Sequence, residues 1–519
     1  MFKFWFYDWL HNYVKIELMF QKTKAFIIRH WPIVAILIIA SFLRLYNLMP
    51  VGDGFNILPP GLYPDEAMNG NNALEALAQR DWKVFYPENF GREGLFINIQ
   101  SWFVKMFGNT AGALRLPSAL FGILTVLGLY AFVKKLFRSE YLALISSFFL
   151  ATSFWHIVFS RIGFRAIMAP AFLLWAFYFG LVAGDRVSRH KKAGWLFALL
   201  SGATYGLGFY SYIAYRATPL LALIFLWIVW KRFFDSDPKK AAYFLLAWSL
   251  AAIVVVMPLV NHFVAHPEDF FGRTSQISVF NSETPVRDLL LNSVKTLGMF
   301  NVAGDFNWRH NFAGRPELFL PVSFFFLLGA YLTVKKILAK KLLRPHIFIF
   351  AWFLIGFLPV VVSNEGLPHA LRSIILIPPV LILAAEGAFF MYFWLKLRFI
   401  NDQKILRILT VGFLAILAFE AYSTYFLAWG LHPKVKDAFA YHDYVFASEI
   451  NQLPAGSPKY ILVPGTEGTI QRDYPISLQS VLFLTDTFTP EKRAAKNIFY
   501  FTPTQFDQLQ FESGIVKSL

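Results

Sequence analysis

The sequence predicts an α-helical polytopic membrane protein with about eleven transmembrane helices, short extracytoplasmic juxtamembrane helices and a small C-terminal α/β lobe. Of its 519 residues, 57% are hydrophobic and 15% are charged, whereas soluble proteins are about 45–50% apolar and about 25% charged. Apolar stretches near the roughly 20-residue length of a membrane span recur along the chain. Clusters of Lys and Arg lie between alternate stretches, which is typical of cytoplasmic connections.

The chain begins with residues 1–30, which mix aromatic and basic side chains and predict an amphipathic segment on the cytoplasmic membrane face. The apolar stretch that follows lacks a small-residue cleavage site, so it is not expected to be a signal peptide. Residues 31–428 form the predicted transmembrane domain. Its spans are expected at 31–49, 111–134, 140–158, 166–184, 193–210, 217–231, 241–262, 317–334, 347–363, 370–394 and 408–428.

The orientation of these spans follows from their connections. The connections after the second, fourth, sixth, eighth and tenth spans all contain several Lys or Arg residues, and the short connections between them contain at most two. Because basic residues in short loops mark the cytoplasmic side, the N-terminus is predicted to lie inside. Three long segments then lie outside: a first outer loop at 50–110, a large outer loop at 263–316, and the C-terminal residues 429–519.

These outer segments have structure of their own in the prediction. Helical patterns at 67–79 and 95–107 predict two helices lying along the membrane surface. After residue 429, a helical stretch at 436–451 is followed by apolar runs at 459–463 and 498–502 that are typical of strands. This alternation predicts a soluble α/β lobe on the outer side.

Composition excludes several classes of site. The net charge is +16, but the basic residues form clusters between spans rather than a stripe with stacking aromatics, so no nucleic-acid partner is expected. There is no cysteine, which excludes disulfides and cysteine-ligated metals. His262 and His266 are four residues apart, but Pro267 follows them and no third ligand is near. We therefore predict neither a metal site nor a cofactor.

The candidate catalytic residues are Asp65 and Glu66, which follow a proline-rich turn just after the first span. Proline followed by two acids is also an ordinary helix start, favoured by the helix dipole. The alternative is chemical: transfer of a sugar to a hydroxyl needs a carboxylate that accepts or orients the proton. Asp65 at a helix N-terminus is expected to stay ionised, which suits a base.

A phosphate leaving group would also need cationic side chains on the outer side. If 161–165 is helical, Arg161 and Arg165 face the same way, and an arginine from another span could complete a phosphate clamp. For each candidate the simpler alternative is a cation beside lipid headgroups. The candidates are Arg92, Arg161, Arg165, Arg309, His369 and Arg372.

Several short motifs, taken in order, resemble one family. The chain is similar over about residues 31–395 to the GT-C glycosyltransferases, and more narrowly to glycosyltransferase family 39, the group of protein O-mannosyltransferases and aminoarabinose transferases. The motifs are Leu43-Arg44-Leu45-Tyr46-Asn47-Leu48, Asp65-Glu66-Ala67, Leu114-Arg115-Leu116-Pro117-Ser118-Ala119, Phe159-Ser160-Arg161-Ile162-Gly163-Phe164-Arg165, Trp308-Arg309-His310-Asn311-Phe312-Ala313-Gly314-Arg315-Pro316, Pro368-His369-Ala370-Leu371-Arg372 and Pro378-Pro379.

The resemblance implies an inverting transfer in the plasma membrane. The donor would be a sugar on dolichyl or undecaprenyl phosphate, and the acceptor, whose class stays open, a hydroxyl on the extracytoplasmic side. Asp65 matches the catalytic Asp of the family and Glu66 its partner. Arg92 lies near the position of a phosphate-binding Lys, although the expected Lys-Pro-Pro is Arg92-Glu93-Gly94 here. Arg161 and Arg165 lack the acid that several members have in this loop.

Two other classes of function stay open. A lipid or sugar flippase would place charged or unwound segments near the membrane midplane, whereas the spans here have few charges at their centres. Glu386 and Glu420 are the acids expected inside spans, where an acid is costly, and we interpret each as structural. The third possibility, a non-catalytic scaffold with a soluble tail, leaves the Asp65–Glu66 pair and the outer arginines unexplained.

Overall fold

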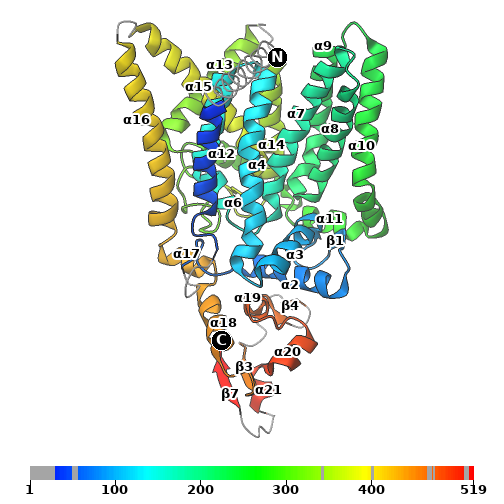
Figure 1. The fold of residues 1–519 in the computed structure, drawn as a ribbon, viewed down its shortest axis with the longest axis vertical. Helices are drawn as coiled ribbons and strands as arrows, with labels where there is room; N and C mark the ends of the chain where they lie inside the picture. The colour runs from blue at the N-terminus through cyan, green and yellow to red at the C-terminus, as the bar shows by residue number, and fades with distance from the viewer. Residues whose placement is uncertain are drawn as a thin grey trace, which may run out of the picture.

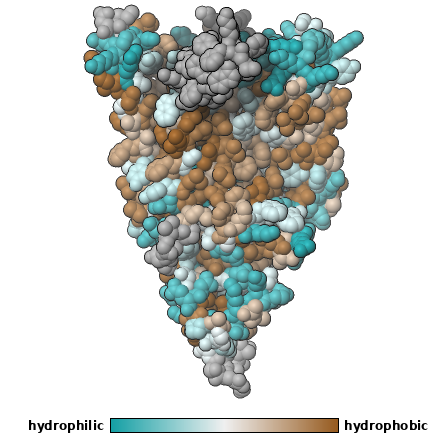
Figure 2. Space-filling model, in the orientation of Figure 1, coloured by the Kyte–Doolittle hydropathy of each residue, from teal (hydrophilic) through white to brown (hydrophobic). Residues whose placement is uncertain are grey.

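The computed structural model describes residues 30–49, 56–339, 344–398, 402–463, 470–471, 474–507 and 514–519. Long helices run roughly parallel in one bundle, and the C-terminal lobe lies at one end of it, opposite the end where the described chain begins (Figure 1). The predicted amphipathic segment 1–30 falls outside the described residues, except for His30. On the face shown in Figure 2, a broad band of hydrophobic surface lies between two more hydrophilic ends.

Helices occupy all the predicted spans. Eight helical segments are long and apolar enough to cross a membrane within the described part of the chain, and the helix His30–Leu45, α5 and α8 are shorter. This is consistent with about eleven spans in a multi-pass membrane protein. After His30–Leu45, the helices of the bundle are α4 (Ala111–Phe137), α5 (Glu140–Thr152), α7 (Met168–Ser188), α8 (Ala193–Leu207), α9 (Thr218–Phe233), α10 (Pro238–Ala265), α13 (Leu320–Leu338), α14 (Arg344–Val361), α15 (Ile377–Arg398) and α16 (Gln403–Tyr422).

Local sequence explains where these helices begin and end. At the start of α4, the Thr110 side chain accepts a hydrogen bond from the backbone N–H of Ala113, and α4 ends at Arg138 in the left-handed conformation. The predicted span 140–158 is divided, because Ser153 adopts an extended conformation and begins a separate helix, α6 (Phe154–Phe159). The break between α5 and α6 is therefore set by a capping side chain.

The outer loops form a layer over one end of the bundle (Figure 1). In the first loop, α2 (Pro64–Gln79) and α3 (Leu95–Phe107) match the predicted surface helices, and a short antiparallel pair, β1 (Phe85–Tyr86) and β2 (Arg92–Glu93), connects them. The large outer loop contributes α11 (Pro267–Gln276) and α12 (Pro285–Gly298), which the sequence analysis did not predict.

The C-terminal lobe contains the predicted α/β structure. Its sheet is parallel, in the order β6-β3-β7, and Lys459 of β3 pairs with Ile498 of β6 and Ile515 of β7. Parallel strands need crossover connections, which the short helices supply. The elements are α17 (Pro433–Ala438), α18 (Tyr441–Gln452), β3 (Lys459–Leu462), β4 (Ile470–Gln471), β5 (Tyr474–Pro475), α19 (Gln479–Leu484), α20 (Pro490–Lys496), β6 (Ile498–Phe501), α21 (Pro503–Asp507) and β7 (Ile515–Ser518).

The lobe contacts the first outer loop directly. The Ser480 hydroxyl donates a hydrogen bond to the backbone carbonyl of Leu62 (2.8 Å), and the Asn71 amide donates to the side-chain oxygen of Gln479 (2.9 Å). Glycine is required at position 70, where a Cβ atom would lie 2.6 Å from the Phe483 ring. The lobe thus packs on α2, the helix that contains Asp65.

Candidate active site

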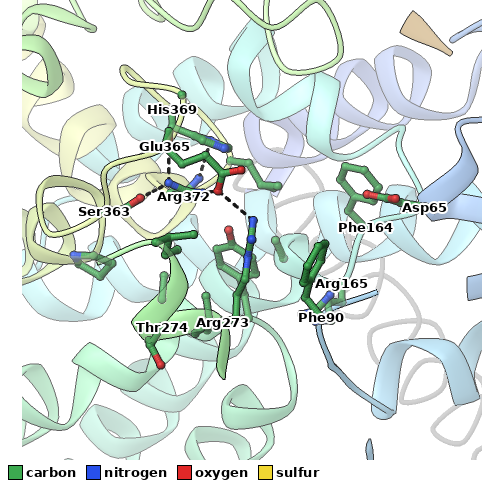
Figure 3. Close-up of a pocket in the computed structure, with 18 of the residues that line it drawn as sticks. Asp65, Phe90, Phe164, Arg165, Arg273, Thr274, Ser363, Glu365, His369 and Arg372 are labelled. Carbon is green, nitrogen blue, oxygen red and sulfur yellow. Dashed lines mark hydrogen bonds and ion pairs between the residues drawn. The ribbon is translucent and has the colours of Figure 1, made fainter. Parts of the chain in front are cut away.

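A cavity of about 800 Å³ lies between the predicted outer loops and the end of the bundle beside them. Six of the eight candidate residues line it, although they come from segments far apart in the sequence: Asp65, Arg92, Arg165, Arg309, His369 and Arg372. Figure 3 shows Asp65 on one side of this cavity, Arg372 and His369 on the other, and Arg165 between them. Glu66 and Arg161 do not line the cavity.

Asp65 follows Pro64 in the first turn of α2, so its carboxylate lies at the positive end of the helix dipole. Burial raises the pKa of this carboxyl above its usual range, although a hydrogen bond with Asn89 and the charge of Arg92 act in the opposite direction. Desolvation is the largest of these effects, and it acts against the ionised form that the helix start favours. A carboxylate with a raised proton affinity is a stronger base.

Glu66 is fully buried and is not among the residues that line the cavity. Its two carboxylate oxygens each accept a hydrogen bond of 2.8 Å from the Arg115 guanidinium, and one of them also accepts the backbone N–H of Gly163 at 2.7 Å. Glu66 thereby connects α2, α4 and the chain before α7. This geometry gives Glu66 a positioning role, without contact to a ligand in the cavity.

Arg161 and Arg165 lie in different surroundings. Arg161 is fully buried, and its guanidinium donates to the backbone carbonyls of Tyr46 (2.6 Å) and Leu58 (2.9 Å). Arg165 begins a short 3₁₀ helix at the cavity, where its Nε lies 2.8 Å from a carboxylate oxygen of Glu93. The condition under which both side chains would face the same way is not met, because residues 161–164 are not helical.

Arg92 is held by the helix that contains Asp65. Its guanidinium donates to the side-chain oxygens of Asn69 (2.7 Å) and Asn72 (2.6 Å), both on α2. Burial, with the nearby charge of Arg165, lowers the pKa of Arg92 to about 10, so it remains protonated at neutral pH. Arg92 therefore adds a fixed positive charge beside Asp65.

Arg372 is neutralised by its neighbours. Its guanidinium donates to the Ser363 hydroxyl and to the carboxylate of Glu365, and the same Glu365 oxygen lies 2.9 Å from the guanidinium of Arg273 (Figure 3). One carboxylate thus holds two cavity arginines. Carboxylates and phosphates present similar oxygens to a guanidinium, so a phosphate could take the place of Glu365.

Arg309 differs from these arginines because no described carboxylate forms an ion pair with it. Its Nε donates to the side-chain oxygen of Asn307 (3.2 Å), and its guanidinium lies 4.0 Å from the centre of the Tyr63 ring, two residues before Asp65. Burial lowers the pKa of Arg309. A buried cation without a counterion favours the binding of an anion.

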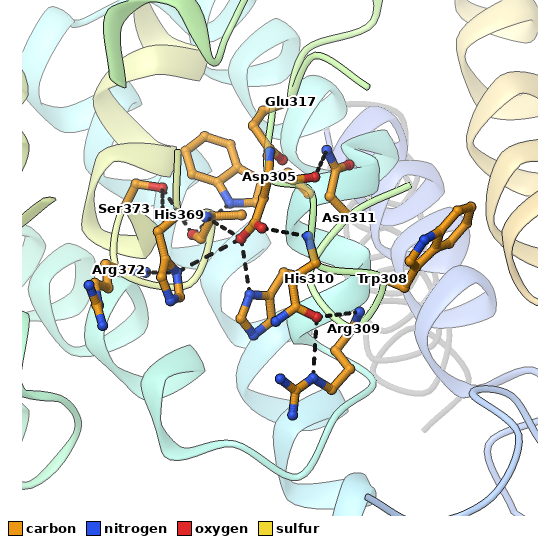
Figure 4. Close-up of polar contacts among 12 residues, drawn as sticks. Asp305, Trp308, Arg309, His310, Asn311, Glu317, His369, Arg372 and Ser373 are labelled. Atoms are coloured by element: carbon orange, nitrogen blue, oxygen red, sulfur yellow. Dashed lines mark hydrogen bonds and ion pairs between the residues drawn. The ribbon is translucent and has the colours of Figure 1, made fainter. Parts of the chain in front are cut away.

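His369 belongs to a cluster that the sequence analysis did not recognise. Its Nδ1 lies 3.8 Å from a carboxylate oxygen of Asp305, and the Nδ1 of His310 lies 3.0 Å from the same oxygen (Figure 4). Ala370 donates its backbone N–H to this oxygen at 2.8 Å. His310 lies within a motif already noted for its neighbour Arg309, but nothing in the local pattern distinguished Asp305.

The lining also includes Tyr212, Arg216 and Arg273, which were not predicted. Arg216 lies 3.6 Å from Glu93, the carboxylate that also pairs with Arg165. Arg216 offered a usable signal, since the short connections predicted to lie outside have at most two basic residues each. The convergence of these three residues on one cavity, however, depends on how distant segments pack.

Comparison with known proteins identifies related folds. Residues 95–262 match the family model described as dolichyl-phosphate-mannose-protein mannosyltransferase. No curated protein matches the chain in sequence. The fold comparison covers more of the chain than the family model does.

Solved structures with a similar fold cover most of the chain. The apo oligosaccharyltransferase of Archaeoglobus fulgidus has a TM-score of 0.52 and 14% identity over 92% of this chain, which spans 65% of the length of that protein. ArnT from Cupriavidus metallidurans bound to undecaprenyl phosphate has a TM-score of 0.52 and 15% identity, over 87% of this chain and 84% of that one. ArnT from the same organism in the apo state has a TM-score of 0.51 and 13% identity, over 89% of this chain and 85% of that one. These matches confirm the predicted GT-C type fold.

Proposed function

We propose that this protein is an inverting glycosyltransferase that moves a sugar from a polyprenyl-phosphate donor to an acceptor hydroxyl on the extracytoplasmic side of the membrane. The observation that supports this most is the single cavity where Asp65 meets a set of arginines at the outer end of an apolar bundle. A prenyl tail would stay in the bilayer beside the bundle while its phosphate reaches the arginines. The solved ArnT structure that holds undecaprenyl phosphate supports the same donor class.

In the proposed reaction the Asp65 carboxylate accepts the proton of the acceptor hydroxyl. The hydroxyl oxygen attacks the anomeric carbon, and the bond from that carbon to the phosphate oxygen breaks, with its electron pair passing to the phosphate. Arg309 and Arg92 would stabilise the charge that develops on the leaving phosphate. Arg165 and Arg372 become available for the same role when the phosphate replaces Glu93 and Glu365 as their partners.

The proposed orientation places the cavity outside the cytoplasm. It rests on the basic connections at the opposite end of the bundle, which are typical of the cytoplasmic side. A flippase is the alternative function. It is less well supported, because the cavity lies among the predicted outer loops. The ion pairs of Arg92 with Glu88 and of Arg165 with Glu93 lie there as well.

The test uses purified protein in lipid nanodiscs with a set of undecaprenyl- and dolichyl-phosphate sugars and a cell-envelope extract as acceptor. Transfer of a labelled sugar, with release of the polyprenyl phosphate, is the expected result for the parent, and its loss is expected for Asp65→Asn. Lipid translocation in proteoliposomes is measured in parallel. Translocation that Asp65→Asn leaves unchanged, without any transfer by the parent, would instead identify a flippase.

A further inference from the structure

We infer that Asp305, His310 and His369 form a binding site for one divalent transition-metal ion, of which Zn²⁺ fits best, in the wall of the cavity. The three side chains come from two segments, the large outer loop and the chain before α15. Their potential ligand atoms all lie within 4.8 Å of one another. The inference goes beyond the proposed function and does not depend on it.

The distances are close to those that a small cation requires. From one carboxylate oxygen of Asp305, the Nδ1 of His310 is 3.0 Å away and the Nδ1 of His369 is 3.8 Å away (Figure 4). Ligand atoms about 2.0–2.2 Å from a tetrahedral zinc ion lie roughly 3.3–3.6 Å apart. The two distances to the Asp305 oxygen therefore differ from these values by only a few tenths of an ångström, and all three atoms lie within 4.8 Å of one another.

The surroundings hold the carboxylate in position. The other oxygen of Asp305 accepts the backbone N–H of Asn307 at 2.8 Å, and the candidate ligand oxygen accepts the backbone N–H of Ala370 at 2.8 Å. Asp305 is 3% exposed, so these bonds fix its orientation away from bulk solvent. Hydrogen bonds of this kind to a metal-binding carboxylate orient it and strengthen the site.

The Nδ1 atom of His369 carries a lone pair rather than a proton, and a metal ion at this nitrogen would replace one long hydrogen bond. The backbone N–H of Arg372 donates to His369 Nδ1 at 3.4 Å, so this nitrogen is an acceptor rather than a donor. An unprotonated nitrogen and a carboxylate oxygen that face each other at 3.8 Å repel, and a cation between them replaces this repulsion with attraction to both. In a metal-free cluster, only the hydrogen bond between His310 and Asp305 would remain.

The donor set selects the ion. Two imidazoles and one carboxylate suit Zn²⁺, whereas Mg²⁺ and Ca²⁺ prefer oxygen ligands alone. All three residues line the cavity, so the remaining coordination position is open to water or to an anionic ligand. The ion would also join the large outer loop to the chain before α15 and add positive charge next to Arg309.

The test is metal binding by the full chain, purified in detergent with an affinity tag that contains no histidine. After treatment with a chelator, the protein is equilibrated with Zn²⁺ or Co²⁺ and its metal content is measured by mass spectrometry. We expect about one ion per chain for the parent. His310→Ala and His369→Ala should each lower the affinity at least roughly tenfold. The matched control is His266→Ala, an exposed histidine on the large outer loop that pairs with Glu268 rather than with the cluster.

Two further measurements separate the outcomes. Zn²⁺ should raise the thermal midpoint of the parent and of His266→Ala but not that of the cluster variants, and Co²⁺ should give visible absorption bands only in the first two. Equal metal content and equal midpoints in the parent and the double variant His310→Ala/His369→Ala would overturn the inference. None of these readouts uses sugar transfer, so a failure of the proposed function would leave them unaffected.

Discussion

Arg309 and Arg372 line the same cavity but differ in what neutralises them. Glu365 pairs with Arg372, whereas Arg309 has an amide and an aromatic ring as its described partners. A phosphate that reaches Arg372 must first displace a carboxylate, and one that reaches Arg309 gains a contact without losing another. Arg309 is therefore the arginine that we expect to contribute most to donor affinity.

Arg309→Ala is predicted to weaken the binding of undecaprenyl phosphate. A hydrogen bond to a charged group contributes about 1.5–3 kcal/mol, so the dissociation constant should rise roughly tenfold to a hundredfold. Binding is measured by titration in nanodiscs, and Arg287→Ala, which removes an exposed arginine of α12, is the control. Equal affinity in the parent and Arg309→Ala would show that the phosphate is held by other side chains.

Asp65→Asn is predicted to lower transfer roughly 10²–10⁴-fold while leaving the fold intact. Because burial raises the pKa of Asp65, the folded protein holds this proton more firmly than the unfolded chain does. Ionisation of Asp65 then costs stability as the pH rises through the range above its ordinary value of 3.8. The variant should therefore be at least as stable as the parent at neutral pH in thermal unfolding.

The pH profile of the parent provides the second readout for Asp65. Transfer requires the ionised carboxylate, so the rate should rise with pH around a midpoint higher than 3.8. In Asp65→Asn the remaining rate should lack this rise. A profile that is the same in both proteins would assign the base to another group.

At the scale of elements, Glu66 determines where α2 lies. Glu66→Ala would leave Arg115 buried without its counterion, and breaking a buried ion pair costs about 3–5 kcal/mol. We predict a large fall in the thermal midpoint for this variant, in contrast to Asp65→Asn one position earlier. An unchanged midpoint would mean that Glu66 does not fix the helix.

The chain between α14 and α15 is predicted to compete with the donor for two arginines. Glu365→Gln removes the charge that pairs with Arg372 and Arg273, so the affinity for undecaprenyl phosphate should rise several-fold. Undecaprenyl phosphate is titrated into this variant and into Glu268→Gln, which changes an exposed acid of α11 and serves as the control. Weaker binding by Glu365→Gln would contradict the competition and would assign Glu365 to the site itself.

The helices of the bundle were predictable because membrane spans are long, apolar and bounded by basic connections. The division of the span at Ser153 was not, since it depends on one capping side chain within an apolar stretch. Asp65 was found because it is an acid beside the membrane. The different roles of Arg161 and Arg165 were hidden, because their partners come from segments that are distant in the sequence: Tyr46, Leu58 and Glu93.

At the scale of the whole molecule, the orientation can be tested directly because the chain has no cysteine. A single cysteine at Glu491 of the lobe is predicted to react with a membrane-impermeant thiol reagent added to intact cells, and one at Lys239 is predicted to react only after lysis. Both positions are exposed, so burial does not account for a difference. The reverse pattern would invert the proposed topology.

The contact between the lobe and α2 has a consequence for how the protein is made. The hydrogen bond from Asn71 to Gln479 joins residues that are 408 positions apart. Synthesis proceeds from the N-terminus, so the helix that contains Asp65 emerges early and gains its last neighbour only after every span has been inserted. If translation stopped late, the released chain would contain all of its spans, but the lobe would be missing and would not cover α2. Completion of the packing around α2 is thus delayed until translation and export of the final segment have succeeded.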